Sequence, residues 1–159
     1  MINILEYDPP GLKPHLPNRW DHETWIVTRK GRIVFEYNSH VYRLVWQRGF
    51  VTDGGSVPRI AWRVIGHPLG EWLRDYLVHD AFYACEWASR SECDWLFLEL
   101  LQEDGCDWFR RNAIWSAVRA AGGSVWSRHE RKEVLADREL CPLRRDGVRI
   151  YKPITFEAQ

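Results

Sequence analysis

The sequence predicts an α+β fold, in which a small N-terminal antiparallel sheet is followed by a helical half. Two observations predict it. Before residue 47, apolar and polar residues alternate in short runs, as they do in half-buried strands. From Glu71 onward, the apolar residues recur with a period of 3.6, as they do in amphipathic helices. A length of 159 residues, 45% of them hydrophobic, is typical of one domain that buries its own core.

This single domain, 1–159, divides into four predicted segments. Residues 1–22 contain four prolines, which disfavour regular elements, and we interpret them as an irregular arm or edge segment. Residues 24–58 hold the strands and a glycine-rich loop. Residues 59–122 form a helical core, and residues 123–159 form a basic helix and a tail.

Runs of β-branched and aromatic residues predict the sheet. The runs Thr24–Thr28 and Arg32–Tyr37 flank Arg29–Gly31, which is the pattern of a β-hairpin. A third run, His40–Trp46, predicts another antiparallel strand. Apolar residues in the tail, between 148 and 156, indicate one further edge strand.

A helix pair forms the predicted core of the helical half. A short helix over Arg59–Ile65 precedes a longer one that runs from Glu71 to about Ala88. Ser89 and Glu92 have capping-box spacing, which opens a second helix through Leu101. Because the connection is short, we expect these two helices to pack antiparallel.

Two later helices follow from the same signals. Asp107 is positioned to cap a helix that begins at Trp108, and Gly122–Gly123 is expected to stop it. Ser127 and Glu130 repeat the capping-box pattern, which predicts a short charged helix up to about Leu140.

Composition excludes some classes of protein. No run approaches 18 apolar residues, so no transmembrane segment is expected. The cysteines show no C-x-x-C spacing, so we expect free thiols instead of disulfides or a four-cysteine zinc site: Cys85, Cys93, Cys106 and Cys141.

The net charge of zero conceals a basic C-terminal third. Residues 107–152 hold 11 basic and 6 acidic residues, which favours either a solvated helical surface or contact with phosphate, anionic lipid or an acidic partner. A nucleic-acid partner is disfavoured, because the basic residues alternate with acidic ones and no nucleic-acid motif is present.

The densest cluster of reactive side chains lies on the helix pair. His79 precedes the turn by about as much as Asp94 follows it, so the two side chains are expected to meet across the pair. A carboxylate on one imidazole nitrogen leaves the other nitrogen free to act as a general base on water. Tyr83, one turn after His79, is placed to hydrogen-bond Asp94. The alternative is that His79 is a buried histidine satisfied by a carboxylate, with a structural role only.

A cation site is expected beside this cluster. Asp80 points away from the His79–Asp94 contact, and calcium takes carboxylate and backbone carbonyl oxygens. The loop Asp53–Gly54–Gly55 is the upstream glycine-rich segment that can supply such carbonyls, although it can also be a simple turn. Bound calcium would stabilise the oxyanion as water attacks an ester. A transition metal held by His79, Asp80 and Asp94 is a weaker alternative, because there is only one imidazole.

Three stretches in this order resemble a family encoded by phages and prophages, the domain of unknown function 1353. They are Gly49-Phe-Val-Thr-Asp-Gly-Gly-Ser-Val-Pro-Arg59, then His79-Asp-x-x-Tyr83, then Ser89-Arg-x-Glu-x-Asp94-x-x-Phe97. The resemblance covers roughly residues 24–122. It implies a phage context and no particular activity.

The helical core is also similar, more distantly, to the phospholipase A2 superfamily. That resemblance implies His79 as general base, Asp94 as its partner and Tyr83 as a support for Asp94. It also implies Asp80 as a calcium ligand, together with carbonyls of the Asp53–Gly55 loop.

Two functions therefore compete. The first is hydrolysis of a phospholipid ester, with a phospholipid or membrane surface as partner. The second is a non-enzymatic phage protein, such as a tail or virion component or an inhibitor that binds a host protein, in which the cluster is structural. In both cases we expect the host cytoplasm or the virion, because Met1–Pro10 shows no secretory signal pattern.

Overall fold

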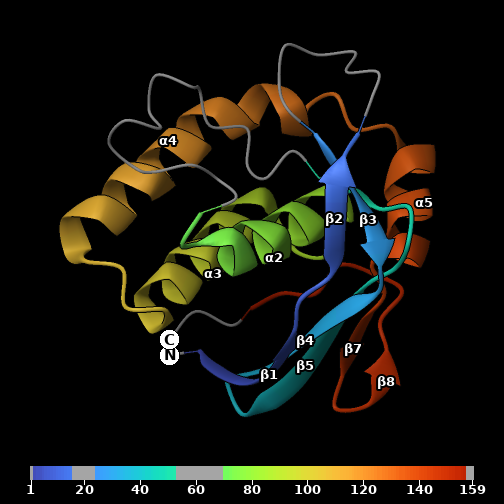
Figure 1. Cartoon of the computed structure of the whole chain (residues 1–159), viewed down its shortest axis with the longest axis horizontal. Coiled ribbons are helices and arrows are strands. Elements are labelled where there is room, and N and C mark those ends of the chain that lie inside the picture. Colours follow the sequence, from blue (N-terminus) through green and yellow to red (C-terminus); the bar gives the residue numbers. More distant parts are fainter. Residues whose placement is uncertain (1, 16–23, 53–69, 157–159) are drawn as a thin grey trace.

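The computed structural model describes residues 2–15, 24–52 and 70–156, and its fold is α+β, as predicted (Figure 1). A five-stranded antiparallel sheet has the order β1-β4-β5-β7-β8, and a three-stranded antiparallel sheet has the order β2-β3-β6. The strands are β1 (Asn3–Asp8), β2 (Gly11–Pro14), β3 (Trp25–Arg29), β4 (Gly31–Tyr37), β5 (His40–Trp46), β6 (Val51–Thr52), β7 (Leu143–Arg145) and β8 (Val148–Arg149).

For the part of residues 1–22 that the structure describes, the irregular arm is wrong and the edge segment is confirmed, because β1 and β2 are each the edge strand of a sheet. There β1 pairs with β4 and β2 pairs with β3. The prolines are compatible with these strands, because Pro9 and Pro10 lie in the link between them. Pro14 ends β2, which is the edge strand of its sheet, where one side of the backbone needs no partner.

The hairpin predicted around Arg29–Gly31 is wrong, because β3 and β4 do not pair with each other and the link between them instead joins the two sheets. Only Lys30 separates β3 from β4, yet β3 belongs to the three-stranded sheet and β4 to the five-stranded one. The chain bends at Gly31, where a Cβ would collide with the backbone of Pro10. Glycine is therefore required at the corner where the β1–β2 link crosses the β3–β4 link.

The helices of the described chain are α2 (Leu73–Ala84), α3 (Arg90–Glu103), α4 (Trp108–Trp126) and α5 (Arg131–Leu140). The capping box of Ser89 and Glu92 is confirmed at the start of α3. Asp107 caps α4 as predicted, by accepting a hydrogen bond from the Arg110 amide at 3.0 Å. In the tail, β8 is the expected edge strand, whereas β7 was not predicted.

The predicted boundary between α4 and α5 is wrong. α4 continues through Gly122 and Gly123 to Trp126, because a helical glycine costs only about 1 kcal/mol relative to alanine. A Cβ at position 122 would lie 2.6 Å from the Tyr83 hydroxyl, so glycine lets α4 approach α2 closely. Ser127 is the C-cap of α4, and Glu130 is the N-cap of α5 without a side-chain capping bond.

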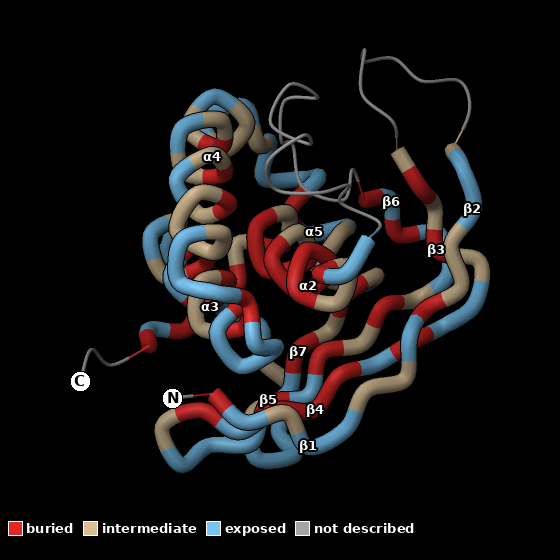
Figure 2. The backbone as a smooth tube through the Cα atoms, turned by 60° about the vertical axis from the view of Figure 1, so that its left-hand side comes forward, coloured by how far each residue is buried: buried red, intermediate tan, exposed pale blue. Residues whose placement is uncertain are grey.

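The core lies between the five-stranded sheet and the helices, which cover one face of that sheet (Figure 2). The inward side chains of β4 and β5 pack against α2, and a second cluster joins α2, α3 and α4. Eight of the twelve residues of α2 are buried, so this helix is enclosed on nearly all sides. The four cysteines are buried and free. The helix expected over 59–65 lies outside the described residues.

None of the described helices is both long enough and apolar enough to cross a membrane.

Candidate functional site

The helix pair brings His79 and Asp94 together. The Nε2 atom of His79, on α2, lies 3.0 Å from Oδ1 of Asp94, on α3. Both residues are buried, with 5% of His79 and 1% of Asp94 exposed. The predicted contact is therefore confirmed. It requires the antiparallel arrangement of α2 and α3, which the capping box at Ser89 sets by ending the turn between them.

Asp94 is held by arginines and not by the tyrosine that the sequence indicated. Nη1 of Arg119, on α4, donates a hydrogen bond to Oδ2 of Asp94 at 3.1 Å. Arg90, one turn before Asp94, lies 3.9 Å from the same oxygen. The Tyr83 hydroxyl donates instead to the carbonyl of Gly122, so its predicted bond to Asp94 is wrong. The carboxylate thus fastens α3 to both α2 and α4.

The second nitrogen of His79 has no hydrogen-bond partner among the described residues. This atom, Nδ1, lies 3.7 Å from Oδ1 of Asp80, beyond hydrogen-bond distance but close enough for electrostatic attraction. Burial lowers the pKa of His79, but the neighbouring carboxylates of Asp80 and Asp94 outweigh burial and raise that pKa to about 9. In this arrangement the resting imidazole is protonated at neutral pH.

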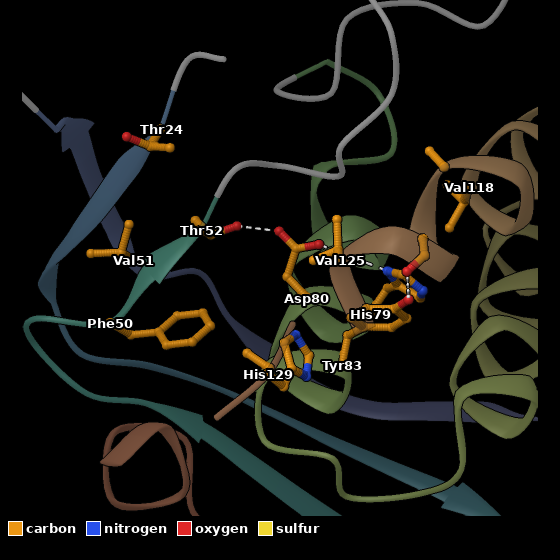
Figure 3. Close-up of a pocket in the computed structure, with 13 residues that line it drawn as sticks. Thr24, Phe50, Val51, Thr52, His79, Asp80, Tyr83, Val118, Val125 and His129 are labelled. Carbon is orange, nitrogen blue, oxygen red and sulfur yellow. Dashed lines mark hydrogen bonds and ion pairs between the residues drawn. The ribbon is translucent and has the colours of Figure 1, made fainter. Parts of the chain in front are cut away.

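His79 and Asp80 lie at a pocket of about 250 Å³ between α2, α4 and the three-stranded sheet (Figure 3). Its other walls are largely apolar, and the lining residues are Thr24, Phe50, Val51, Thr52, His79, Asp80, Tyr83, Ala84, Val118, Ala121, Gly122, Val125 and His129. The pocket therefore combines an apolar surface with a few polar groups, as small-molecule sites commonly do.

The candidate cation site is only partly described. The Thr52 hydroxyl donates a hydrogen bond to Oδ2 of Asp80, which ties the end of β6 to α2. Asp53, Gly54 and Gly55, the other predicted ligands, follow Thr52 directly and lie outside the described residues. Calcium takes six to eight oxygen ligands, and the described residues contain no group of three His, Cys, Asp or Glu side chains that could hold a metal ion. Asp80 alone does not complete such a site, so calcium binding stays a prediction.

A second histidine was missed by the sequence analysis. His129 lines the same pocket, and its Nδ1 lies 3.2 Å from Oε1 of Glu86. The two residues are 43 positions apart, and no local spacing connects them. His129 follows the C-cap of α4, in a stretch that resembles an ordinary charged helix start, so only the packing of α4 against α2 reveals it.

The arrangement supports acid–base chemistry. His79 lines the pocket and has one nitrogen fixed by a buried carboxylate, while the other nitrogen is buried without a hydrogen bond among the described residues, an arrangement that suits a general base. The imidazole ring is held by Tyr83 and Phe97, with ring centroids 5.2 and 5.0 Å away. A fixed ring and a fixed tautomer are what a base needs to take a proton from a positioned water.

Comparison with known proteins gives one match. A family model described as "Protein of unknown function (DUF1353)" matches residues 30–118. These residues include β4, β5, the helix pair and the first part of α4, and therefore His79, Asp80 and Asp94. His129 lies beyond the matched range. No curated protein and no solved structure matches the chain.

Proposed function

The chain belongs to the DUF1353 family of proteins of unknown function, and we propose that its pocket hydrolyses a phospholipid ester with His79 as general base. The observation that supports this proposal most directly is that only one of the two ring nitrogens of His79 has a hydrogen bond among the described residues. Its Nε2 is engaged by Asp94, while its Nδ1 has no described hydrogen-bond partner and belongs to a residue that lines the pocket. A purely structural histidine would be expected to satisfy both nitrogens.

The proposed reaction needs one proton transfer at His79. Nδ1 takes a proton from water while the water oxygen attacks the ester carbonyl carbon. Asp94 accepts the hydrogen bond from Nε2 and stabilises the imidazolium that forms. Arg119 keeps the Asp94 carboxylate in place. When the carbon–oxygen bond to the alcohol breaks, a fatty acid and a lysophospholipid are released.

His79 must lose its resting proton before it can act as a base. The carboxylates of Asp80 and Asp94 raise its pKa, and Asp94 is needed to orient the ring. Asp80 is the carboxylate whose neutralisation would make deprotonation easier. Calcium, where bound at Asp80 and the Asp53–Gly55 segment, would supply positive charge that polarises the ester carbonyl.

The apolar walls support a substrate with an acyl chain. Phe50, Val118 and Val125 line the pocket around the polar groups, and burial of hydrocarbon there is favourable by about 25 cal/mol per Å². The resemblance of the helical core to the phospholipase A2 superfamily supports the same substrate class. A phage origin, with action on a host membrane, is part of this proposal.

The test is hydrolysis of dihexanoyl phosphatidylcholine by the purified protein, with and without calcium, followed by titration of the released acid. We expect hydrolysis by the wild type and a loss of about 10³-fold in His79→Gln, because general bases contribute 10² to 10⁴. His40→Gln is the matched control, since His40 makes an exposed contact with Asp146. No hydrolysis by folded wild-type protein, at any calcium concentration up to the millimolar range, would refute the proposal.

A non-enzymatic binding protein is the second candidate, and one observation favours it. The Asp94 carboxylate contacts His79 of α2 and Arg119 of α4, which is also what a structural fastening of three helices would look like. In that case wild-type protein hydrolyses no ester, while His79→Gln lowers the melting temperature. Pull-down from host extract would then identify a partner.

A further inference from the structure

His129, which lines the pocket, forms a second histidine–carboxylate pair with Glu86. Nδ1 of His129 lies 3.2 Å from Oε1 of Glu86, and the side chains are 17% and 33% exposed. His129 lies between α4 and α5, and it does not cap α5, whose N-cap is Glu130. The imidazole of His129 therefore has no capping role at the start of α5.

Glu86 is held in an unusual backbone conformation. Its φ is 46°, in the left-handed region that a residue with a side chain adopts at a cost of about 1–2 kcal/mol. Arg138, on α5, fixes this turn by donating to the carbonyl of Cys85 at 2.7 Å and to that of Glu86 at 3.0 Å. Such conformations persist where the surroundings determine them, and they are common at functional sites. This fixed turn therefore positions the Glu86 carboxylate beside His129.

The two histidines lie on either side of Tyr83. The Tyr83 ring centroid is 5.2 Å from that of His79 and 5.7 Å from that of His129. Trp126 packs against both Tyr83 and His129, with ring centroids 4.7 and 5.5 Å apart. Figure 3 shows His129 and Tyr83 side by side at the pocket, with Asp80 nearby. Aromatic packing and Glu86 therefore both hold the His129 ring in place.

We propose that His129 is a second catalytic residue, the general acid that protonates the leaving alkoxide of the ester. This inference rests on the hydrolase activity proposed above. Because Nδ1 of His129 is engaged by Glu86, its Nε2 is the nitrogen available to the pocket. Glu86 orients the ring through Nδ1, which leaves Nε2 as the nitrogen that can donate a proton to the leaving group.

The proton balance is complete with two histidines. Water gives one proton to Nδ1 of His79 as its oxygen bonds to the carbonyl carbon. The tetrahedral intermediate then breaks its bond to the alcohol oxygen, which takes a proton from Nε2 of His129. The neutral His129 regains a proton from solvent, and the His79 imidazolium releases one. No oxidant, reductant or co-reactant other than water is required.

Changing the leaving group of the substrate distinguishes an acid role of His129 from a structural role. An alkoxide is a far stronger base than a thiolate, so its departure depends on an acid while that of a thiolate does not. We would compare dihexanoyl phosphatidylcholine with its thioester analogue, which has the same acyl chains. For His129→Gln we expect kcat to fall at least about 100-fold on the oxygen ester and less than about 5-fold on the thioester. His79→Gln, which lacks the base, should lose activity on both.

Glu86→Gln tests the same role without changing the histidine. It should show the same preference for the thioester at a smaller amplitude, because the neutral amide still accepts from the ring but holds it less firmly than a carboxylate does. Equal losses on both substrates in His129→Gln and Glu86→Gln, or an unchanged rate on the oxygen ester, would refute the acid role and leave the proposed hydrolase intact. If the wild type hydrolyses neither substrate, the proposed function fails, and this inference fails with it.

Discussion

Two histidine–aspartate contacts in this chain differ in almost everything except their chemistry. His79 and Asp94 meet in the core at 3.0 Å, with side chains 6% and 1% exposed. His40 and Asp146 meet at the surface, between the start of β5 and the β7–β8 turn, at 2.6 Å and with side chains 47% and 49% exposed. The surface contact is shorter, yet the buried one has the larger effect on the molecule, because the charges in it cannot be screened by water.

The electrostatic response at each contact shows this difference. Burial alone would lower the pKa of His79, but Asp80 and Asp94 raise it to about 9. At the surface, the Val41 amide and His40 lower the pKa of Asp146 by donating hydrogen bonds to its carboxylate. The buried carboxylate also links three helices, whereas the Asp146 carboxylate ties the β7–β8 turn to the start of β5. Contact distance is therefore a poor guide to the importance of an ion pair, and burial and shared partners are better ones.

The largest expected effect separates the two aspartates directly. Asp94→Asn keeps the shape of the side chain but removes the charge that holds His79 and Arg119, and we expect a loss of about 4 kcal/mol in the free energy of unfolding. This corresponds to a fall on the order of 10 °C in melting temperature for a chain of this size. Asp146→Asn should leave the melting temperature unchanged within error, because its contact is exposed. Thermal unfolding followed by circular dichroism measures both, and equal effects of the two variants would contradict the comparison.

A third aspartate, Asp75, extends the comparison, because it is buried and only one of its two carboxylate oxygens has a hydrogen bond among the described residues. Oδ1 of Asp75 accepts from Nε of Arg74 at 3.0 Å, while Oδ2 has no hydrogen bond among the described residues. Burial raises the pKa of Asp75 from 3.8 to about 7, although Arg74 opposes the shift. The folded protein therefore binds a proton that the unfolded chain has lost between about pH 4 and 7, and the stability contributed by Asp75 falls as the pH rises through that range.

Asp75→Asn should remove this pH dependence. With a folded pKa of about 7 and an unfolded value of 3.8, the variant should be more stable than the wild type by about 3 kcal/mol at pH 6, and by less than about 1 kcal/mol at pH 4. Urea unfolding at the two pH values gives both numbers. A variant that is less stable than the wild type at pH 6 would show that the contact with Arg74 outweighs the cost of burying the charge.

The same distinction explains which parts of the site the sequence could predict. The contact of His79 with Asp94 follows from three local features: two adjacent helices, a capping box, and the nearly equal distances of the two residues along the chain from the turn between these helices. Arg119 and Gly122 belong to α4, and their contacts depend on how that helix crosses the pair. Gly122 and Gly123 indicated the end of a helix. The sequence alone does not distinguish a glycine that ends a helix from one that lets the helix pack closely against a neighbour, as Gly122 does against Tyr83.

The strands show a similar division. β3, β4 and β5 were predictable because their alternation is local and their turns are short. β1 was missed because it pairs with β4 across more than 20 residues, and because prolines beside it are typical of irregular chain. His129 was missed for the same reason as Arg119: Glu86 and the pocket are brought to it by tertiary packing. Local patterns predicted the contact of His79 with Asp94, and long-range packing supplied the other contacts of the candidate site.

The smallest expected effect concerns two adjacent glycines of α4 that differ in what they face. A Cβ at position 122 would lie 2.6 Å from the buried Tyr83 hydroxyl, whereas one at position 123 would meet only the end of the Arg90 side chain, at 3.4 Å. Gly123→Ala should stabilise the protein by up to about 1 kcal/mol, because alanine is the better helix former and the arginine can move. Gly122→Ala should destabilise it by about 1 kcal/mol, because overpacking of the Tyr83 ring outweighs the gain in helix propensity.

The proposed hydrolysis makes the comparison of the glycines more specific. Tyr83 packs against both pocket histidines, so its displacement in Gly122→Ala should lower the rate of ester hydrolysis, while Gly123→Ala should retain the wild-type rate. Thermal unfolding and the phosphatidylcholine assay, applied to both variants, separate a change in stability from a change in the site. If Gly122→Ala were as stable and as active as Gly123→Ala, the approach of α4 to Tyr83 would not control the pocket, and the close packing at Gly122 would matter only for the path of the helix.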